Sequence, residues 1–359
     1  MTFRRWDTAI IVDADAERPG TEKTGRDAGH KKIEAIAPVI ISASRATDIP
    51  AFYADWFMAR FRKGYVKWNN PYSHSTQYVS FAKTRVIVFW SKNPREIMKY
   101  LEELDSKDVN YYFQFTLNDY EQEQLEPGLP PLDKRIETFI NLAEMIGPER
   151  VLWRFDPLVL SNTLSIDTLI SRIGDIGDCI QGSTRRFIFS YVDIVAYRKI
   201  GKNLAGSCFS DLREFTHDEK IIFAKKLQEL NHQWNLELFT CGEEIDLMQY
   251  GILKGNCVDY NLMIRLFHQD RELMNFLRQT GEAGRAGFRQ GIPALFPKDT
   301  GQRKECGCHV SKDIGQYNTC IHLCAYCYAN RSDETAKRNF DRYLRGAAQG
   351  QFYETIIPD

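Results

Sequence analysis

The sequence lacks an excess of charge of either sign and has no long apolar run. Its 359 residues hold 47 Lys and Arg against 48 Asp and Glu, which excludes a polyanion binder that works through bulk charge. No apolar run approaches the ~20 residues that span a bilayer, and the start lacks the apolar stretch of a secretion signal. We therefore expect a cytoplasmic protein with no membrane segment.

Two common catalytic motifs are also missing. No glycine-rich phosphate fingerprint follows a predicted strand, and there is no nucleophile elbow, so nucleoside triphosphate hydrolysis and serine hydrolase chemistry are excluded. By contrast, 43% of the residues are hydrophobic and 13% are aromatic, which is enough to build a packed core. The composition predicts a globular protein of one large domain or two ordinary ones.

The nine cysteines are unevenly distributed, and their distribution is the most informative feature of the sequence. Clustered thiols in a reducing compartment bind metal more often than they form disulfides. The cluster therefore predicts a metal site, and the scattered cysteines are expected to be core or rim residues. The scattered cysteines are Cys179, Cys208, Cys241 and Cys257, and the clustered ones are Cys306, Cys308, Cys320, Cys324 and Cys327.

Apolar, β-branched segments alternate with amphipathic segments along most of the chain. This alternation predicts parallel βαβ units, and we expect an α/β fold with a full or partial TIM-type barrel of six to seven parallel strands and a C-terminal cysteine-rich module. The capping box at Thr216–Glu219 predicts one helix start. Strands are expected at residues 39–43, 85–90, 111–116, 151–155, 186–191 and 236–240, and around 258–260.

The same reading divides the chain into four parts. Residues 1–36 are expected to form an N-terminal strand or hairpin extension, and residues 37–295 the barrel. Residues 296–332 are expected to form the cysteine-rich module, and residues 333–359 a tail helix. Basic and aromatic residues in this tail suggest nucleic acid contact only weakly, and packing of an amphipathic helix on the barrel is the alternative.

Polar side chains follow the predicted strands, and active sites of barrels form where strands end. Four of them are candidates to orient a polar or anionic substrate: Arg45, Lys92, Arg154 and Asp156. Four more are candidates to contact a cofactor: Ser44, Asn93, Gln114 and Ser190. Each has a structural alternative, since Asn93 could cap a helix and Arg154 could pair with Asp156.

Soft thiolates at short spacing suit either an iron–sulfur cluster or a zinc ion. Zinc would use Cys306 and Cys308 with Cys324 and Cys327, at a separation loosely like a zinc ribbon, which leaves Cys320 unexplained. An iron–sulfur cluster would use the C-x3-C-x2-C triplet at residues 320–327. His309 and His322 lie in the same segment and could serve as a ligand, a proton donor or a hydrogen-bond partner.

The triplet, with Tyr326 before its last cysteine, resembles the cluster loop of radical S-adenosylmethionine enzymes, and the string Cys324–Tyr328 most resembles the spore photoproduct lyase branch. The resemblance implies a [4Fe–4S] cluster on three thiolates, with the fourth iron open for S-adenosylmethionine. It also implies a reductant protein such as a flavodoxin or ferredoxin, and a small-molecule or nucleotide substrate.

Residues from roughly 36 to 332 resemble the bacterial family known as domain of unknown function 1848. The resemblance implies a barrel with a C-terminal cysteine module and assigns no reaction. It rests on the cysteine loop and on the strings at residues 41–53, 88–94, 112–116 and 153–157.

The sequence departs from radical S-adenosylmethionine enzymes in the position of the cysteine loop, which follows the last strand rather than the first. Cys306 or Cys308 could also supply a fourth thiolate and close the cluster. Glu243, in a Gly-Glu-Glu turn, could bind the amino group of the cofactor, or could simply start a helix. Two hypotheses therefore remain: a radical enzyme, and a non-catalytic iron–sulfur or zinc protein with a structural, redox-sensing or partner-binding role.

Overall fold

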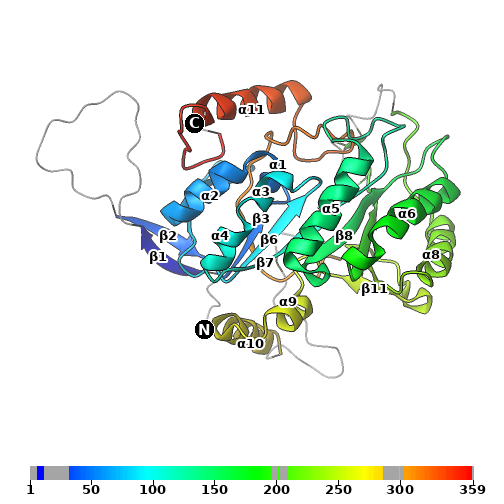
Figure 1. The fold of residues 1–359 in the computed structure, drawn as a ribbon, viewed down its shortest axis with the longest axis horizontal. Helices are drawn as coiled ribbons and strands as arrows, with labels where there is room; N and C mark the ends of the chain where they lie inside the picture. The colour runs from blue at the N-terminus through cyan, green and yellow to red at the C-terminus, as the bar shows by residue number, and fades with distance from the viewer. Residues whose placement is uncertain are drawn as a thin grey trace, which may run out of the picture.

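A large parallel sheet forms the centre of the chain (Figure 1). The structure is a computed structural model that describes residues 6–11, 32–195, 200–201, 209–285, 299 and 303–357. Eight strands pair in the order β11-β10-β9-β8-β7-β6-β3-β12, and every neighbouring pair is parallel. They are β3 (Ile40–Ala43), β6 (Val86–Ser91), β7 (Asn110–Thr116), β8 (Val151–Leu158), β9 (Arg186–Tyr191), β10 (Glu237–Cys241), β11 (Ile252–Gly255) and β12 (Lys312–Asp313).

The sheet is open, and the expectation of a full barrel is wrong. Within the described ranges, β11 pairs only with β10, and β12 pairs only with β3. The last strand, β12, is two residues long. Two helices, α9 (Tyr260–Phe267) and α10 (Arg271–Arg285), contribute side chains to the core on the face that strand side chains fill in a closed barrel.

The six strands predicted between residues 39 and 240 are confirmed as β3 and β6 to β10. The seventh prediction, around residues 258–260, is wrong because the strand there is β11, which ends at Gly255. Asp259 instead caps α9, and its carboxylate accepts hydrogen bonds from the backbone N–H groups of Asn261 and Leu262.

Helices follow each of the first five strands of the large sheet. The capping box predicted at Thr216 is confirmed, since Thr216 and Glu219 exchange both of its hydrogen bonds at the start of α8. The helices are α1 (Ile49–Phe52), α2 (Ala54–Lys63), α3 (Arg95–Met98), α4 (Leu101–Ser106), α5 (Leu132–Ile146), α6 (Ile166–Ile180) and α8 (His217–Asn231), with short 3-10 turns at Pro148–Arg150, Gln181–Ser183 and Met248–Tyr250.

The two faces of the sheet carry different cores because successive strand residues point to opposite sides. Phe113, Trp153 and Phe189 belong to the larger core, which helices α1 to α6 and α8 cover. Tyr112 and Leu152 belong to the second core, with apolar side chains of α9 and α10. Figure 1 shows α9 and α10 on the lower side of the sheet, away from α2 and α5.

A second, four-stranded sheet lies beside the large one. Its order is β1-β2-β5-β4, and the N-terminal strand β1 pairs antiparallel with β2. The connection between these two strands lies outside the described residues. The strands are β1 (Asp7–Ile11), β2 (Ile33–Ala37), β4 (Tyr65–Asn69) and β5 (Thr76–Ser80).

The last helix, α11 (Asp333–Ala347), lies above α1 and α2 in Figure 1. The ring of Tyr343 packs edge-on against Tyr53, with 4.7 Å between the ring centroids. Beyond the helix, the carbonyl of Tyr353 accepts a hydrogen bond from the indole of Trp56 at 2.8 Å, and that of Glu354 accepts one from the backbone N–H of Lys67. The C-terminal segment therefore contacts α2, β4 and the residue between α1 and α2.

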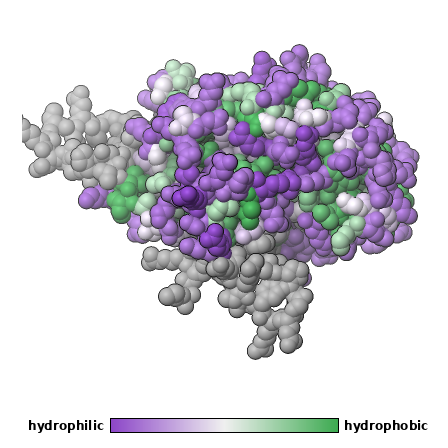
Figure 2. Space-filling view, turned by 60° about the horizontal axis from the view of Figure 1, so that its bottom comes forward, coloured by the Kyte–Doolittle hydropathy of each residue, from purple (hydrophilic) through white to green (hydrophobic). Residues whose placement is uncertain are grey.

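The surface is largely polar where it can be seen. Figure 2 shows hydrophilic side chains over much of the described part of one face, with apolar residues in separate patches between them. None of the helices in the described part of the chain is both long enough and apolar enough to span a bilayer.

Candidate functional site

A cavity of about 330 Å³ lies at the carboxyl ends of the parallel strands. This is the edge where ligands bind in α/β sheets, because the strand-to-helix loops meet there. Seven of the nine cysteines line it, while Cys179 is exposed and Cys208 lies outside the described residues. The lining cysteines are Cys241, Cys257, Cys306, Cys308, Cys320, Cys324 and Cys327.

The same face of the sheet is apolar near the amino ends of the strands and polar near their carboxyl ends. On β8, Leu152 lies in the apolar core whereas Arg154, two residues later, reaches the cavity. On β9, Ile188 and Ser190 repeat this change. The strand alternation therefore places the polar residues above the apolar core, as the sequence predicted.

The loop that carries Cys320, Cys324 and Cys327 is fixed by backbone hydrogen bonds to the segment before α5. Gly128 N–H donates to the carbonyl of His322 at 3.0 Å, and Ala325 N–H donates to the carbonyl of Leu125 at 2.9 Å. A Cβ atom on Gly128 would lie 2.2 Å from the carbonyl oxygen of Ile321, so only glycine allows this approach.

The thiols of this loop interact electrostatically. Cys320 interacts with Cys327, and Cys324 interacts with both. Burial and the nearby carboxylate of Asp48 raise the pKa of Cys320 to about 12. Burial also raises the pKa of Cys324, although Lys92 opposes it. Cys320 and Cys324 are therefore protonated near neutral pH unless a cation binds beside them.

A buried carboxylate, Asp48, connects three parts of the site. Its Oδ1 accepts hydrogen bonds from Ser91 Oγ at 2.7 Å and from Ala51 N–H at 3.0 Å, which caps α1. Its Oδ2 lies 2.7 Å from Nε2 of His322 and accepts from the backbone N–H of Lys92 at the same distance. One carboxylate thus joins the loop after β3, the end of β6 and the cysteine loop.

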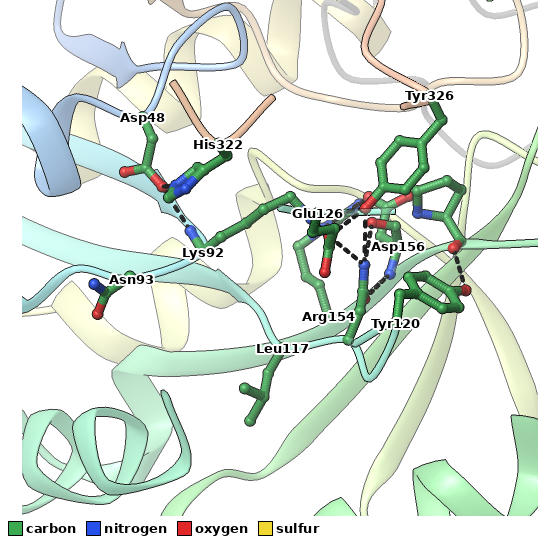
Figure 3. Close-up of polar contacts among 12 residues, drawn as sticks. Asp48, Lys92, Asn93, Leu117, Tyr120, Glu126, Arg154, Asp156, His322 and Tyr326 are labelled. Atoms are coloured by element: carbon green, nitrogen blue, oxygen red, sulfur yellow. Dashed lines mark hydrogen bonds and ion pairs between the residues drawn. The ribbon is translucent and has the colours of Figure 1, made fainter. Parts of the chain in front are cut away.

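A second network surrounds Glu126. Figure 3 shows Lys92 reaching toward Glu126 from one side and Tyr326 approaching from the other. Lys92 Nζ lies 2.6 Å from Glu126 Oε1, the Tyr326 hydroxyl donates to the same oxygen, and Asn118 Nδ2 donates at 3.1 Å. Burial would raise the pKa of Glu126, but the charge and hydrogen bond of Lys92 lower it below the ordinary value.

A third network joins β8 to β9. Arg154 Nε donates to Asp156 Oδ2 at 3.1 Å, and Ser190 donates to the other carboxylate oxygen. Arg154 Nη1 also contacts Gln114 Oε1 at 3.2 Å and Cys257 Sγ at 3.1 Å. The Arg154–Asp156 pair expected as the structural alternative therefore exists, and it lies on the cavity wall.

Arg45 lies deep in the cavity between an aromatic ring and acidic groups. Its guanidinium carbon is 5.0 Å from the centroid of Trp90, and that of Arg154 is 5.4 Å from the same ring. Burial would lower the pKa of Arg45, but Cys308 and Asp313 raise it. One of its terminal nitrogens, Nη2, is buried with no hydrogen-bond partner.

Asp313, on β12, fixes the turn that carries Arg45. Its carboxylate accepts hydrogen bonds from Ser44 Oγ at 2.7 Å, Ser42 Oγ at 3.0 Å and the backbone N–H of Arg45 at 2.8 Å. A Cβ atom on Gly315 would lie 1.8 Å from Ser44 Oγ, so the chain after β12 needs glycine there.

The remaining cavity cysteines form a second group. Cys241 Sγ and Cys257 Sγ are 2.9 Å apart, and Cys308 shares thiol hydrogen bonds with Cys257 and Cys306. These hydrogen bonds, and the charge of Arg45, lower the pKa of Cys308. Cys306 and Cys308 thus contact Cys241 and Cys257, two cysteines that the sequence analysis expected to be core or rim residues.

Twelve of the fifteen site residues predicted from the sequence line the cavity. Three do not. Gln114 is fully buried and supports Arg154 and the carbonyl of Cys257, and the backbone N–H of Asn93 donates to Ser91 Oγ. Glu243 accepts from Tyr191 N–H and pairs with Lys220 at 3.2 Å. The lining residues are Ser44, Arg45, Lys92, Arg154, Asp156, Ser190, Cys306, Cys308, Cys320, Cys324, Tyr326 and Cys327.

The histidines near the cysteines have different surroundings. His322 lines the cavity and contacts Asp48, whereas His309 is buried against Thr280, with 3.1 Å between Nε2 and Oγ1. Burial lowers the pKa of His309 to about 4, so it is neutral at physiological pH. Only His322 is therefore placed to act on a ligand of the cavity.

Sequence reasoning missed Glu126, Asp313 and Trp90. Glu126 lies in an irregular segment between β7 and α5, and Asp313 lies on a two-residue strand, so neither has a periodic signal. Trp90 is the last apolar residue of β6, and an apolar residue at this position predicts only a strand. The sequence did contain a signal that Cys241 lies at the cavity, because this residue directly follows the strand predicted at residues 236–240.

Among the residues that the structure describes, no three His, Cys, Asp or Glu side chains are placed to hold a metal ion. The thiols make contacts with one another and with cationic side chains instead. The iron–sulfur and zinc predictions therefore remain predictions that rest on the type and grouping of the donors.

Comparison with curated proteins and with solved structures found no match. A family model described as domain of unknown function (DUF1848) matches residues 40–329. This range includes β3 at one side of the sheet and all seven cysteines of the cavity. The chain therefore belongs to the DUF1848 family.

Proposed function

We propose that this protein is a radical S-adenosylmethionine-like enzyme that acts on a polar or nucleotide-like substrate. In this proposal Cys320, Cys324 and Cys327 hold three irons of a [4Fe–4S] cluster. One observation carries it: these three thiols line a cavity at the carboxyl ends of the strands, beside buried charged networks.

The contacts of Cys306 and Cys308 support three ligands rather than four. Cys306 and Cys308 are the candidates for a fourth thiolate, but each contacts the other, and Cys308 also contacts Cys257. Within the loop, Cys324 interacts with Cys320 and Cys327. A closed, non-catalytic cluster would require Cys306 or Cys308 to leave these contacts.

When bound, a cluster with one open iron supplies an electron to the sulfonium of S-adenosylmethionine, and this chemistry requires a site that excludes water. The residues of the chain suit such a site. The Asp48–His322 contact holds the loop against β6, and Lys92 with Glu126 places a buried ion pair below Tyr326.

Arg45 and Trp90 supply the features expected for a polar or nucleotide-like ligand. The indole of Trp90 holds the guanidinium groups of Arg45 and Arg154 beside it, and the unpaired Nη2 of Arg45 suits an anionic group. The reductant remains a flavodoxin or ferredoxin in this proposal. The open sheet with sequential strand order is compatible with the partial TIM-type barrel predicted from the sequence.

The test is anaerobic purification and reconstitution with iron and sulfide, followed by addition of dithionite and S-adenosylmethionine. We expect broad absorption near 400 nm, about four irons per chain and formation of 5′-deoxyadenosine. Cys324→Ala should lose the iron and the product, whereas Cys179→Ala, at an exposed position of α6, should keep both.

Two results would reject the proposal. Iron that binds normally but yields no 5′-deoxyadenosine, and that is lost in Cys306→Ala, would favour the closed, non-catalytic cluster. A preparation that never binds iron at the loop, with unchanged spectra in Cys324→Ala, would exclude both iron hypotheses.

A further inference from the structure

Four cysteines from three separate segments meet on one wall of the cavity. Cys241 ends β10, Cys257 follows β11, and Cys306 and Cys308 precede β12. Cys241 Sγ and Cys257 Sγ are 2.9 Å apart, and Cys308 shares hydrogen bonds with Cys257 and Cys306. Parallel strands bring the first two together, and a chain segment about 50 residues later adds the other two.

The backbone around these cysteines is fixed by side chains of the sheet. The carbonyl of Cys257 accepts hydrogen bonds from the Tyr112 hydroxyl and from Gln114 Nε2, both at 2.8 Å. Cys308 Sγ accepts from the backbone N–H groups of Cys257 at 3.2 Å and Val258 at 3.4 Å. N–H groups directed at a sulfur stabilise a thiolate, the form that binds metals.

The turn between Cys306 and Cys308 lies close to Asn256, the residue before Cys257. A Cβ atom on Gly307 would lie 2.2 Å from the side-chain amide of Asn256, so glycine lets the turn contact the segment that carries Cys257. With its amide nitrogen facing the carbonyls, Asn256 donates to Gly307 O at 3.1 Å and to Gly255 O at 3.2 Å. One residue therefore links the Cys257 segment to the turn.

Positive charge lies next to the four sulfurs. Arg154, which is 2% exposed, donates to Cys257 Sγ at 3.1 Å, and Arg45 Nη2 is buried without a hydrogen-bond partner. A divalent ion with four thiolates carries two net negative charges, and buried charge of this kind must be paired. The two guanidinium groups offset part of that charge, since Arg154 is also paired with Asp156 and Arg45 also lies near Asp313.

We propose that Cys241, Cys257, Cys306 and Cys308 bind one tetrahedral thiophilic metal ion, with Zn²⁺ as the representative, at a site separate from Cys320, Cys324 and Cys327.

The spacing of the sulfurs decides between one ion and a cluster. Zinc–sulfur bonds of about 2.3 Å place the sulfurs of a tetrahedral site about 3.8 Å apart. As they lie in the structure, no three of these side chains are placed to hold a metal ion, so binding requires the thiols to move. Cys241 Sγ and Cys257 Sγ must separate from 2.9 Å by about 1 Å to reach this distance. A [4Fe–4S] cluster has four irons between its ligands and requires a larger expansion of the group.

The first test measures metal in the intact protein, purified anaerobically from zinc-supplemented medium. We expect one zinc per chain, with X-ray absorption showing four sulfur neighbours at about 2.3 Å. Alkylation before and after removal of zinc by a chelator, read by mass spectrometry, should show protection of these four cysteines only while zinc is present. This second measurement needs no variant and therefore does not depend on how a variant folds.

Variants then separate this site from the loop. Cys241→Ser and Cys308→Ser should weaken zinc binding at least tenfold, whereas Cys324→Ser and the exposed-site control Cys179→Ser should keep it. The inference is independent of the proposed function, because zinc and the loop iron are measured separately.

Three results would overturn the proposal. These are the absence of thiolate-bound zinc from the wild-type protein, loss of iron rather than zinc in Cys241→Ser, and a Cys241–Cys257 disulfide in the anaerobic preparation.

Discussion

His322 Nε2 lies 2.7 Å from Asp48 Oδ2, and both side chains are at least nine-tenths buried. The two residues are 274 positions apart in the sequence. The same carboxylate caps α1 and accepts the backbone N–H of Lys92, so the cysteine loop is held by a group that also fixes the first helix and the end of β6.

Asp48→Asn should therefore loosen the cysteine loop and destabilise the fold. An amide in place of the carboxylate directs a donor at groups that themselves donate, which costs about 2–3 kcal/mol for buried partners. Urea unfolding should show a lower midpoint with an unchanged slope. Asp341→Asn, at an exposed position of α11, should change the midpoint little, and an equal loss in both variants would refute the role of Asp48.

The Lys92–Glu126 pair predicts a pH dependence. The pKa of Glu126 is lowered from 4.5 in the folded protein because Lys92 outweighs burial. Its stabilisation is therefore complete above pH 4.5 and is lost as the pH falls through the lowered value. The pKa of Lys92 is raised from 10.5, so its contribution is present below pH 10.5 and is lost only as the pH rises through the raised value.

Glu126→Gln should test this by leaving Lys92 buried without its counter-charge. We expect a loss of about 3 kcal/mol at pH 7, and a smaller dependence of stability on pH below 4.5 than in the wild type. Denaturant titrations at several pH values measure both. The exposed variant Glu102→Gln is the control, and parallel pH profiles for wild type and Glu126→Gln would contradict the assignment.

Gly128→Ala should displace the cysteine loop. Its added methyl group would lie 2.2 Å from the carbonyl oxygen of Ile321 and 2.7 Å from Cα of His322, and backbone atoms cannot rotate away as side chains do. We expect a lower melting temperature and reduced iron uptake. Gly182→Ala is the matched control because nothing lies within 4 Å of its Cβ position, and similar behaviour of the two variants would show that the contact is unimportant.

Arg154→Lys should weaken metal binding by the four-cysteine group. Lysine keeps the charge but cannot contact Asp156, Gln114 and Cys257 at once, as the guanidinium does. Loss of a hydrogen-bonding partner beside a metal ligand costs 10- to 100-fold in affinity, which chelator competition measures. Arg62→Lys, which alters an exposed pair with Glu103, should have no effect on affinity.

The residues that could be predicted follow the ends of long, apolar strands. Arg154 and Ser190 occupy the first polar position after apolar residues on one face of β8 and β9, so strand periodicity alone places them at the cavity. Gln114 has the same position on β7 but is covered by Cys257, a contact that periodicity cannot reveal.

The cysteine groups show where the sequence was insufficient. Placing the seventh strand at residues 258–260 rather than at Ile252–Gly255 removed Cys257 from the set of residues that follow strands. Chain proximity also favoured one module for Cys306 through Cys327. The structure divides this segment because β12 runs between the two groups and pairs with β3.

Other site residues depend on contacts between distant segments. Asp313 and Ser42 are 271 residues apart, and Glu126 meets Tyr326 across 200 residues. No local sequence pattern predicts either pair, because the two residues meet only after the sheet has formed. Residues of the cavity wall follow strand ends and could be predicted from the sequence. The hydrogen-bond networks around Asp313 and Glu126 depend on contacts between distant segments and could not.

The pairing of β12 with β3 has a consequence for biosynthesis. The strand that borders β3, and both cysteine segments beside it, are translated after every other strand of the sheet. Residues 40–43 therefore wait at an unfinished sheet edge until more than 310 residues have been synthesised. Any metal must enter after the ribosome has delivered these last segments, so a delay between translation and metal delivery would leave the thiols exposed to oxidation.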